Sequence, residues 1–361
     1  MKKNFLLAFT VVLLMLFTGC NFLTANKEDE KEAEPEWLSF TGTALTAAGT
    51  VNVDMGGGNT ATFNLVKFGD WPQTIMASNV TIDKSKATKA GLFTYYKGSD
   101  GAWYYECKET GKSYTNKLHY TDGTEVKMGG ESTRWFKVEP IVWRVITNDY
   151  NSSGKKLLIA EKVLINTAFY DYTVNRNING ETIYPNNYEH SRVRAFLNGN
   201  NYMKQEKEDA SLENDETFVD NGFLQTAFTT ELQNAIHTTA VINDADSAKP
   251  KVNYYSNSYV NNYVFNKTLN DKVFLLSQQE ATDYDYGFAY DMYSTNPSVY
   301  RFATDFAKAS GTVPANQSPY ATDWWLRSPY DMQPYYVSLN TNYCNVNLST
   351  QGIIPALCLE N

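Results

Sequence analysis

The sequence predicts an α+β fold that is loop-rich and combines short antiparallel strands with a few helices. Short apolar runs alternate with polar residues, two segments carry apolar residues at helical spacing, and Gly, Asn, Asp and Ser separate these runs. From residue 38 onward no second linker and no internal repeat interrupts this pattern. We therefore expect one domain over residues 38–361.

The strand predictions depend on alternation and on turn residues. Residues 60–68 alternate apolar and polar side chains, as a half-buried strand does. Residues 141–146 and 157–160 flank a loop rich in Asn, Ser and Gly, which predicts a hairpin. A second hairpin is predicted from residues 103–107 and 113–120, and residues 271–277 predict a buried strand.

Two helices are predicted from capping residues and apolar spacing. Ser191 can cap a helix over residues 192–197, and Asn198 with Gly199 ends it. Thr229 or Thr230 can cap a second helix over residues 231–237, and a further short helix is expected within residues 278–285. The residues expected to face the core are Val193, Phe196 and Leu197 in the first helix and Leu232, Ala235 and Ile236 in the second.

Composition narrows the function. The chain has 31 basic and 40 acidic side chains and a net charge of −9, so it lacks the basic surplus of a nucleic-acid binder. Three His do not favour a multi-histidine metal site, and four Cys are too few for a disulfide scaffold. We expect no nucleic-acid partner, no metal and no cofactor. Tyr, at 26 residues, and Asn are abundant, and both suit contact surfaces.

The N-terminus predicts a lipid anchor. Residues 1–19 have a positive start and an apolar run too short to span a bilayer, and Phe17-Thr18-Gly19-Cys20 resembles a bacterial lipobox. That resemblance implies cleavage before Cys20 and acylation of Cys20 by palmitate-type chains; the alternative is an ordinary secretory signal followed by an incidental Cys. Residues 20–37 are acidic and predict a solvated tether. Asn21 after the Cys favours the outer membrane, so we expect a lipid-anchored protein at the cell surface.

Five short sequence motifs, called the sequence words below, occur in the same order as in a known family that this chain resembles. They are FGDWPQ at 68–73, PIVWRV at 140–145, SRVRAFLN at 191–198, FLLS at 274–277 and WWLRSP at 324–329. Together they resemble bacterial extracellular domains that look like formylglycine-generating-enzyme relatives of the C-type lectin fold. The resemblance covers about residues 60–361 and implies a C-type-lectin-like domain. The family's closing Gly-x-Arg-Pro-Ala has Ile354 at its Arg position here.

A lipobox, this domain and a Tyr/Asn-rich C-terminus resemble surface lipoproteins of the Treponema variable protein type. The resemblance implies a diversity-generating retroelement, which mutates adenines at Asn codons and so reaches Tyr, Asp, Ser and Cys. It implies a variable ligand-binding region at about residues 324–350. Met332 and Gln333 do not fit such codons. The expected ligand-binding residues are Tyr330, Asp331, Tyr335, Tyr336, Ser338, Asn340, Asn342, Tyr343, Cys344, Asn345 and Asn347.

The residues themselves indicate the same region. Val337 and Leu339 alternate with polar or aromatic residues, as do Val346 and Leu348, and residues 341–344 separate the two runs. This predicts a hairpin whose apolar face packs on the domain and whose Tyr- and Asn-bearing face points outward. Such a face resembles a paratope; the alternative is an ordinary solvated sheet face. Trp324 and Trp325 are expected in the core beneath it.

These observations favour a monomeric surface protein that binds an extracellular protein or other macromolecule, rather than an enzyme with catalytic residues. The alternative is a lipoprotein enzyme or a metal-dependent lectin of the same fold. A formylglycine-generating type of enzyme requires a reactive Cys pair, and Cys344 and Cys358 are the only close pair; Cys107 and Cys358 are expected to be free and buried. Asp283, Asp285 and Asp291 suggest oxygen ligands for Ca²⁺ but fail the EF-hand spacing. The residues His119, His190 and His237 have no catalytic motif around them.

The lipid anchor gives the first testable prediction. Cys20→Ala removes the acylated thiol, and the short apolar leader cannot hold the protein in a bilayer, so the variant should be released as a soluble protein. Labelled palmitate incorporation and membrane fractionation measure this. Acyl label that persists in Cys20→Ala would show that the anchor is elsewhere.

Overall fold

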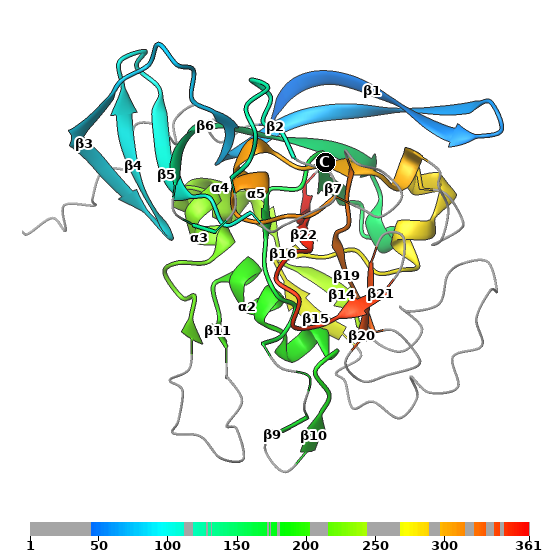
Figure 1. Ribbon diagram of the computed structural model, residues 1–361. Coiled ribbons are helices and arrows are strands. Elements are labelled where there is room, and N and C mark those ends of the chain that lie inside the picture. The colour runs from blue at the N-terminus through cyan, green and yellow to red at the C-terminus, as the bar shows by residue number, and fades with distance from the viewer. Residues whose placement is uncertain are drawn as a thin grey trace, which may run out of the picture. The chain divides into compact units, whose positions relative to one another are not determined.

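The computed structural model describes residues 45–111, 118–127, 129–130, 132–171, 173, 175–178, 181–202, 216–243, 268–288, 297–314, 321–329, 336–339 and 343–360. The chain divides into two units, residues 1–34 and residues 35–361, and every described residue belongs to the second. The expected signal peptide, Cys20 and the whole expected tether lie outside the described residues. The arrangement of the elements is shown in Figure 1.

A large antiparallel sheet dominates the second unit. Its strands run in the order β13-β23-β7-β6-β5-β4-β3, while β2 pairs with β6, β1 with β2, and β16 with β23. Strand β6 is central because it pairs with three strands. On one edge its first part pairs with β5 and its last part with β7, and on the other edge it pairs with β2. The strands are β1 (Thr46–Gly56), β2 (Asn59–Ile75), β3 (Ile82–Ala90), β4 (Phe93–Gly98), β5 (Trp103–Lys108), β6 (Thr133–Thr147), β7 (Lys156–Ala160), β13 (Ile236–His237), β16 (Val273–Phe274) and β23 (Ala356–Leu359).

Smaller antiparallel sheets surround this one. Five of those in the described ranges have two strands, and one, β19-β20-β21, has three. Their strands are β8 (Ile165–Asn166) with β22 (Gly352–Ile353), β9 (Arg176–Ile178) with β10 (Glu181–Ile183), β11 (Asn201–Tyr202) with β12 (Glu216–Thr217), β14 (Thr239–Ile242) with β15 (Thr268–Asp271), β17 (Arg301–Phe302) with β18 (Ala321–Thr322), and β19 (Trp325–Pro329), β20 (Tyr336–Leu339) and β21 (Tyr343–Asn345).

The helices are short. In the described ranges the α-helices are α2 (Arg192–Asn198), α3 (Phe223–Ala227), α4 (Thr230–Ala235) and α5 (Asp305–Ala309), and the longest has seven residues. The 3₁₀ turns are η2 (Tyr150–Ser152), η3 (Tyr188–His190), η6 (Glu280–Thr282), η7 (Tyr284–Tyr286) and η8 (Pro297–Val299). The prediction of an α+β C-type-lectin-like fold is therefore wrong as a fold class, because the chain is mostly antiparallel β-sheet.

The predicted first helix is confirmed with its caps. The Ser191 hydroxyl accepts the N–H of Arg194, and the apolar face of α2 is buried. Gly199 ends the helix with a φ of 69°, in the left-handed region that a residue with a Cβ rarely adopts. The second helix is also present: Thr229 caps α4 through the N–H of Leu232. It is shorter than predicted, since it ends at Ala235, which is exposed.

The two hairpin predictions have opposite outcomes. Strands β6 and β7 pair as expected, with Arg144 opposite Ile159. The predicted hairpin between residues 103–107 and 113–120 does not form at Tyr104 and Tyr105, because β4 pairs with them on one edge and β6 on the other. The pairing with β4 ends at Tyr105. Residues 112–117 lie outside the described residues.

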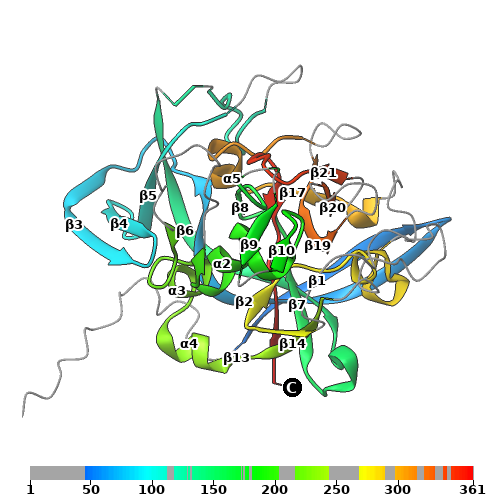
Figure 2. The same ribbon diagram turned by 90° about the horizontal axis from the view of Figure 1, so that it is seen from below.

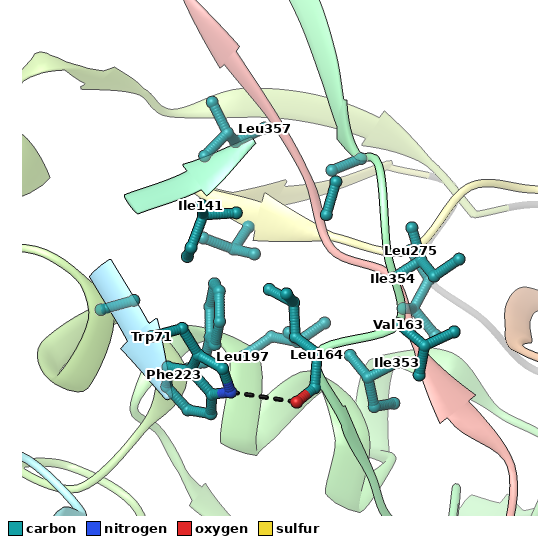
Figure 3. Packing of buried hydrophobic residues seen from close by; sticks show 14 of the residues in the cluster. Trp71, Ile141, Val163, Leu164, Leu197, Phe223, Leu275, Ile353, Ile354 and Leu357 are labelled. Carbon is teal, nitrogen blue, oxygen red and sulfur yellow. Dashed lines mark hydrogen bonds between the residues drawn. The ribbon is translucent and has the colours of Figure 1, made fainter. Parts of the chain in front are cut away.

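Two tryptophans of the sequence words form hydrogen bonds with segments that are distant in the sequence. Trp71 donates its indole N–H to the Leu164 carbonyl at 3.0 Å, and Trp143 donates to the Phe68 carbonyl at 2.7 Å. Both side chains are fully buried. Figure 3 shows the Trp71 bond beside Leu197 and Phe223. A buried indole N–H that lacked a partner would be costly, so these bonds specify which segments meet.

A glycine creates a bulge at the start of the first word. Gly69 has a φ of 72°, and the register of β2 against β6 shifts between Lys67 and Asp70. A Cβ on Gly69 would lie 2.4 Å from the ring of Phe228, so no other residue fits. The bulge changes the course of β2 immediately before Asp70 and Trp71.

Asp70 is buried within this sheet. Its side chain has no solvent exposure, and neither carboxylate oxygen has a hydrogen-bond partner among the described residues. Burial raises the pKa of Asp70 to about 7. In the unfolded chain Asp70 has its ordinary pKa of 3.8. Between this pH and about pH 7, Asp70 is therefore protonated in the folded protein and ionised in the unfolded chain.

This difference predicts how stability depends on pH. The contribution of Asp70 is least unfavourable below about pH 4, where both states are protonated, and it worsens until the pH passes the folded pKa of about 7. The total change is on the order of 4 kcal/mol. Asp70→Asn should remove it, so the variant should gain stability over the unaltered protein as pH rises from 5 to 8. Urea unfolding across this range measures the effect.

A control separates this effect from the loss of one negative charge. Asp54→Asn changes an exposed carboxylate on β1 and should leave the pH profile close to that of the unaltered protein. Parallel profiles for Asp70→Asn and the unaltered protein would contradict the assignment.

Candidate functional site

The C-terminal sequence forms a hairpin, as expected, but its second strand is Tyr343–Asn345 and not the predicted run over residues 345–349. Strands β20 and β21 are antiparallel, with Tyr336 opposite Asn345, Val337 opposite Cys344 and Ser338 opposite Tyr343. Strand β20 also pairs with β19 through Trp325–Leu339 and Pro329–Val337, with an irregularity between these pairs. Figures 1 and 2 show β20 and β21 next to β19. The hairpin is thus extended by one strand that the sequence did not predict as its neighbour.

Strand β19 is a buried support for the hairpin. All five of its residues are buried, and Trp325 donates its indole N–H to the Thr167 carbonyl at 2.8 Å. Trp324, directly before β19, is also fully buried and donates to the Val299 carbonyl at 3.3 Å. The prediction that these two tryptophans belong to the core is confirmed.

The centre of β19 carries a buried ion pair. Arg327 is 2% exposed and binds Glu280 with two nitrogens, at 2.5 and 3.0 Å. Its remaining donors reach the carbonyls of Leu275 at 2.7 Å and Ile242 at 3.0 Å. Every guanidinium nitrogen therefore has an acceptor, which a buried charge requires if it is not to be strongly destabilising.

Glu280 is equally well satisfied. Besides Arg327, it accepts the Tyr150 hydroxyl at 2.5 Å and the Ser277 N–H at 2.7 Å. Burial alone raises the pKa of Glu280, but the Arg327 charge and these hydrogen bonds outweigh it, so the pKa lies below its ordinary value. Glu280 therefore stays ionised, and the pair joins β19 to the segment after β16 and to the β6–β7 connection.

The turn after β21 is attached to the domain by backbone contacts. The Val346 carbonyl accepts the Tyr170 N–H at 3.0 Å, and the Val346 side chain is fully buried. Asn166 donates its amide to the Ser349 carbonyl at 2.6 Å. Both sides of the hairpin are therefore fixed, by β19 on one side and by this turn on the other.

These contacts lie in the part of the chain that a family model covers. The model described as a domain of unknown function, DUF6273, matches residues 153–361, which is more than half of the chain. The chain belongs to the DUF6273 family. No curated protein and no solved structure matches it.

The DUF6273 region does not complete the main sheet by itself. It begins three residues before β7, and the edge of β7 that faces away from β23 is covered by β6, which lies outside the match. The pair Arg144–Ile159 and the bond from the Glu161 N–H to the Val142 carbonyl cross this boundary. The N-terminal strands are therefore structural neighbours of the DUF6273 core.

The structure places the predicted ligand-binding residues unevenly. Asn347 is exposed, whereas Cys344 and Asn345 are half-buried, and the Asn345 side-chain oxygen has no partner among the described residues. Cys344 packs against the hydrophobic core and accepts the Gln351 amide at 3.4 Å. Only the backbone is described for Tyr336, Ser338 and Tyr343, and Tyr330, Asp331, Tyr335, Asn340 and Asn342 lie outside the described residues.

One expected anchor of the hairpin is wrong. Leu348 was predicted to pack on the domain with Val346, yet it is 40% exposed. Strand β21 ends at Asn345, and Val346 and Asn347 already form a turn, so alternation no longer decides which way Leu348 points. Leu348 thus joins Asn347 and Ser349 as an exposed residue beside the hairpin. This turn has no signal in the sequence, because Val is a typical strand residue and the apolar alternation continues to Leu348.

The residues suggested for a reactive Cys pair and for a Ca²⁺ site do not have the features of such sites where the structure describes them. Cys107, Cys344 and Cys358 are free, and burial raises the pKa of Cys107 to about 12 and that of Cys358 to about 11, which is opposite to an activated thiol. Asp283 is buried and caps η7 by accepting the Asp285 N–H; Asp291 lies outside the described residues. Within the described ranges, no three His, Cys, Asp or Glu side chains form a metal-binding group. None of the described helices has the length and apolar character that a membrane crossing needs.

The buried ion pair gives a stability prediction. Arg327→Met leaves the Glu280 carboxylate buried without its counter-charge, which should cost about 3–5 kcal/mol in the free energy of unfolding. Replacing both residues, Arg327→Met with Glu280→Leu, should recover much of that loss because no unpaired charge remains. Guanidinium chloride unfolding measures both.

An exposed ion pair is the matched control. Lys84 and Glu106 form a bridge at 3.4 Å with side chains 64% and 35% exposed, so Lys84→Met should cost less than about 1 kcal/mol. If Arg327→Met were no more damaging than Lys84→Met, the role assigned to the Arg327–Glu280 pair would be incorrect.

Proposed function

We propose that this protein is a surface-displayed lipoprotein that binds an extracellular macromolecule through the β20–β21 hairpin and the turn that follows it. The observation that carries the proposal is the contrast between two adjacent parts of one small sheet. Strand β19 is wholly buried and joined to the core by a fully satisfied ion pair. The hairpin beside it carries Tyr336, Ser338, Tyr343 and Asn345 among its residues and continues into exposed Asn347, Leu348 and Ser349.

The register supports a division of the hairpin into two faces. Residues that stand directly opposite each other in an antiparallel pair belong to the same face. Tyr336 with Asn345, and Ser338 with Tyr343, therefore share one face, and Val337 with Cys344 belong to the other. Tyr provides a large contact area at a small cost in side-chain entropy, and Asn and Ser provide adaptable hydrogen bonds.

A rigid support beneath a varied surface also suits the proposed retroelement. Substitutions at exposed positions change stability by about 0.5 kcal/mol or less, so such positions tolerate diversification. Positions such as Val346 and Arg327, which are buried and make specific contacts, do not. Acylation at Cys20 would place the domain at the cell surface, where a macromolecular partner is accessible to a shallow face.

The experiment uses a variant of three hairpin tyrosines, Tyr335→Ala with Tyr336→Ala and Tyr343→Ala. If these side chains form the contact surface, the melting temperature should stay within a few degrees of the unaltered protein while the set of captured extracellular proteins changes. Val346→Asp should instead unfold the protein, because it buries an unpaired charge. Thermal melts and affinity capture followed by mass spectrometry provide the measurements.

The matched control replaces two half-buried tyrosines elsewhere, Tyr96 on β4 and Tyr284 on η7, by Ala. This pair should leave the captured set unchanged. If the triple variant unfolds, the tyrosines belong to the core. If it stays folded and captures the same partners as the unaltered protein, the hairpin is not the binding surface.

A further inference from the structure

Two buried arginines other than Arg327 lie outside the hairpin. Arg144 on β6 is 3% exposed and Arg301 on β17 is 2% exposed. Each guanidinium lies over an aromatic ring, that of Arg144 at 5.7 Å from the Phe63 ring centre and that of Arg301 at 5.4 Å from the Phe288 ring centre. Two guanidinium cations have thus been removed from water.

One carboxylate, that of Glu161, interacts with both arginines. The parallel bridge between Val163 and Ala303 brings the segments of Glu161 and Arg301 together, and the Glu161 charge acts on Arg301. The bond from the Glu161 N–H to the Val142 carbonyl places Glu161 beside β6 as well. Its carboxylate binds Arg144 with two bonds, at 2.9 and 2.6 Å, so it is committed to one of the two cations.

Three donor nitrogens of this cluster remain unused. Arg301 gives Nη1 to the carbonyls of Ser298 and Tyr300, at 3.0 and 2.9 Å. Its Nε and Nη2, together with Nη1 of Arg144, are buried and have no hydrogen-bond partner in the part of the chain that the structure describes. Two positive charges therefore face one negative charge, and the unused N–H groups belong to both arginines.

The electrostatics agree with this geometry. Burial, and then the neighbouring charge of Arg144, lower the pKa of Arg301 to about 9, although Glu161 acts in the opposite direction. Arg327, which is buried to the same extent, has every nitrogen paired, and the charge of Glu280 raises its pKa against the effect of burial. Arg327 therefore has one carboxylate to itself, whereas Arg144 and Arg301 share the carboxylate of Glu161.

We propose that Arg144 and Arg301 form a binding site for a small oxoanion, either a phosphate or sulfate ion or the carboxylate of a small organic acid. The planar fork of a guanidinium matches two oxygens of such a group, and one further negative charge balances the cluster. The Phe63 ring lies beside Arg144 and the Phe288 ring beside Arg301. This site is separate from the proposed contact surface on the hairpin.

The test measures anion binding by the full chain directly. Phosphate, sulfate and acetate are titrated separately at constant ionic strength against chloride, by calorimetry and by thermal melting. At least one of them should bind with a stoichiometry of one per chain and raise the melting temperature in a saturable way. The anion that binds most tightly distinguishes tetrahedral from carboxylate ligands. If none of the three binds, the proposal is wrong.

Variants then locate the site. Arg301→Gln should weaken binding by about tenfold or more, because it removes a charge and two of the unused donors. If Arg301→Gln does not fold, Arg144→Lys keeps a cation beside Glu161 while it removes the Nη1 donor, and it should weaken binding in the same direction. Lys84→Met, which removes an exposed cation on β3, should bind like the unaltered protein. Undiminished binding in a folded Arg301→Gln or Arg144→Lys variant would place the anion elsewhere and overturn the proposal.

Discussion

The ion pair between Arg327 and Glu280 is the interaction on which the arrangement of the C-terminal strands depends. It lies where β19, the segment after β16, the end of β14 and the β6–β7 connection meet, and each contributes a partner to it. A buried pair of this kind is not in itself a large source of stability, because desolvation offsets most of the Coulombic attraction. Its effect is on specificity, since any other placement of β19 would leave two buried charges unpaired.

The tryptophans of the sequence words act by the same principle. Each of Trp71, Trp143, Trp324 and Trp325 is fully buried and donates its indole N–H to a backbone carbonyl far away in the chain. A large apolar ring with one obligatory donor fits only where an acceptor is available. The words that carry the family resemblance therefore describe how the core is assembled. Their tryptophans indicate an architecture and do not themselves identify a ligand.

This explains which predictions from the sequence succeeded. Local signals were sufficient for the capped helix at Ser191, the β6–β7 hairpin and the β20–β21 hairpin, because each is specified by neighbouring residues. The fold class was wrong because the longest strands contain Pro72 and Pro140, which normally argue against a strand. Register irregularities around these prolines allow β2 and β6 to continue through them.

Long-range pairings could not be predicted from local pattern. Strand β5 has the composition of a hairpin strand, but β4 and β6 occupy its edges, and nothing in residues 103–108 specifies these partners. Arg327 and Glu280 are likewise far apart in the sequence, so neither identifies the other. At the site, alternation correctly predicted the first strand, but it placed the second strand too late in the chain, and Leu348 lies beyond a turn that begins before the apolar pattern ends.

The two buried arginine clusters differ in how completely their guanidinium nitrogens are paired. Arg327 has an acceptor for every nitrogen, so its environment is complete and the strand that carries it is fixed. Arg301 is as deeply buried, yet two of its nitrogens have no acceptor among the described residues. An unpaired buried donor lowers the stability of the folded protein, and a ligand that accepts its hydrogen bond would remove this effect. At the same burial, Arg327 is therefore fully paired within the protein, whereas Arg301 keeps the unused donors on which the proposed anion site rests.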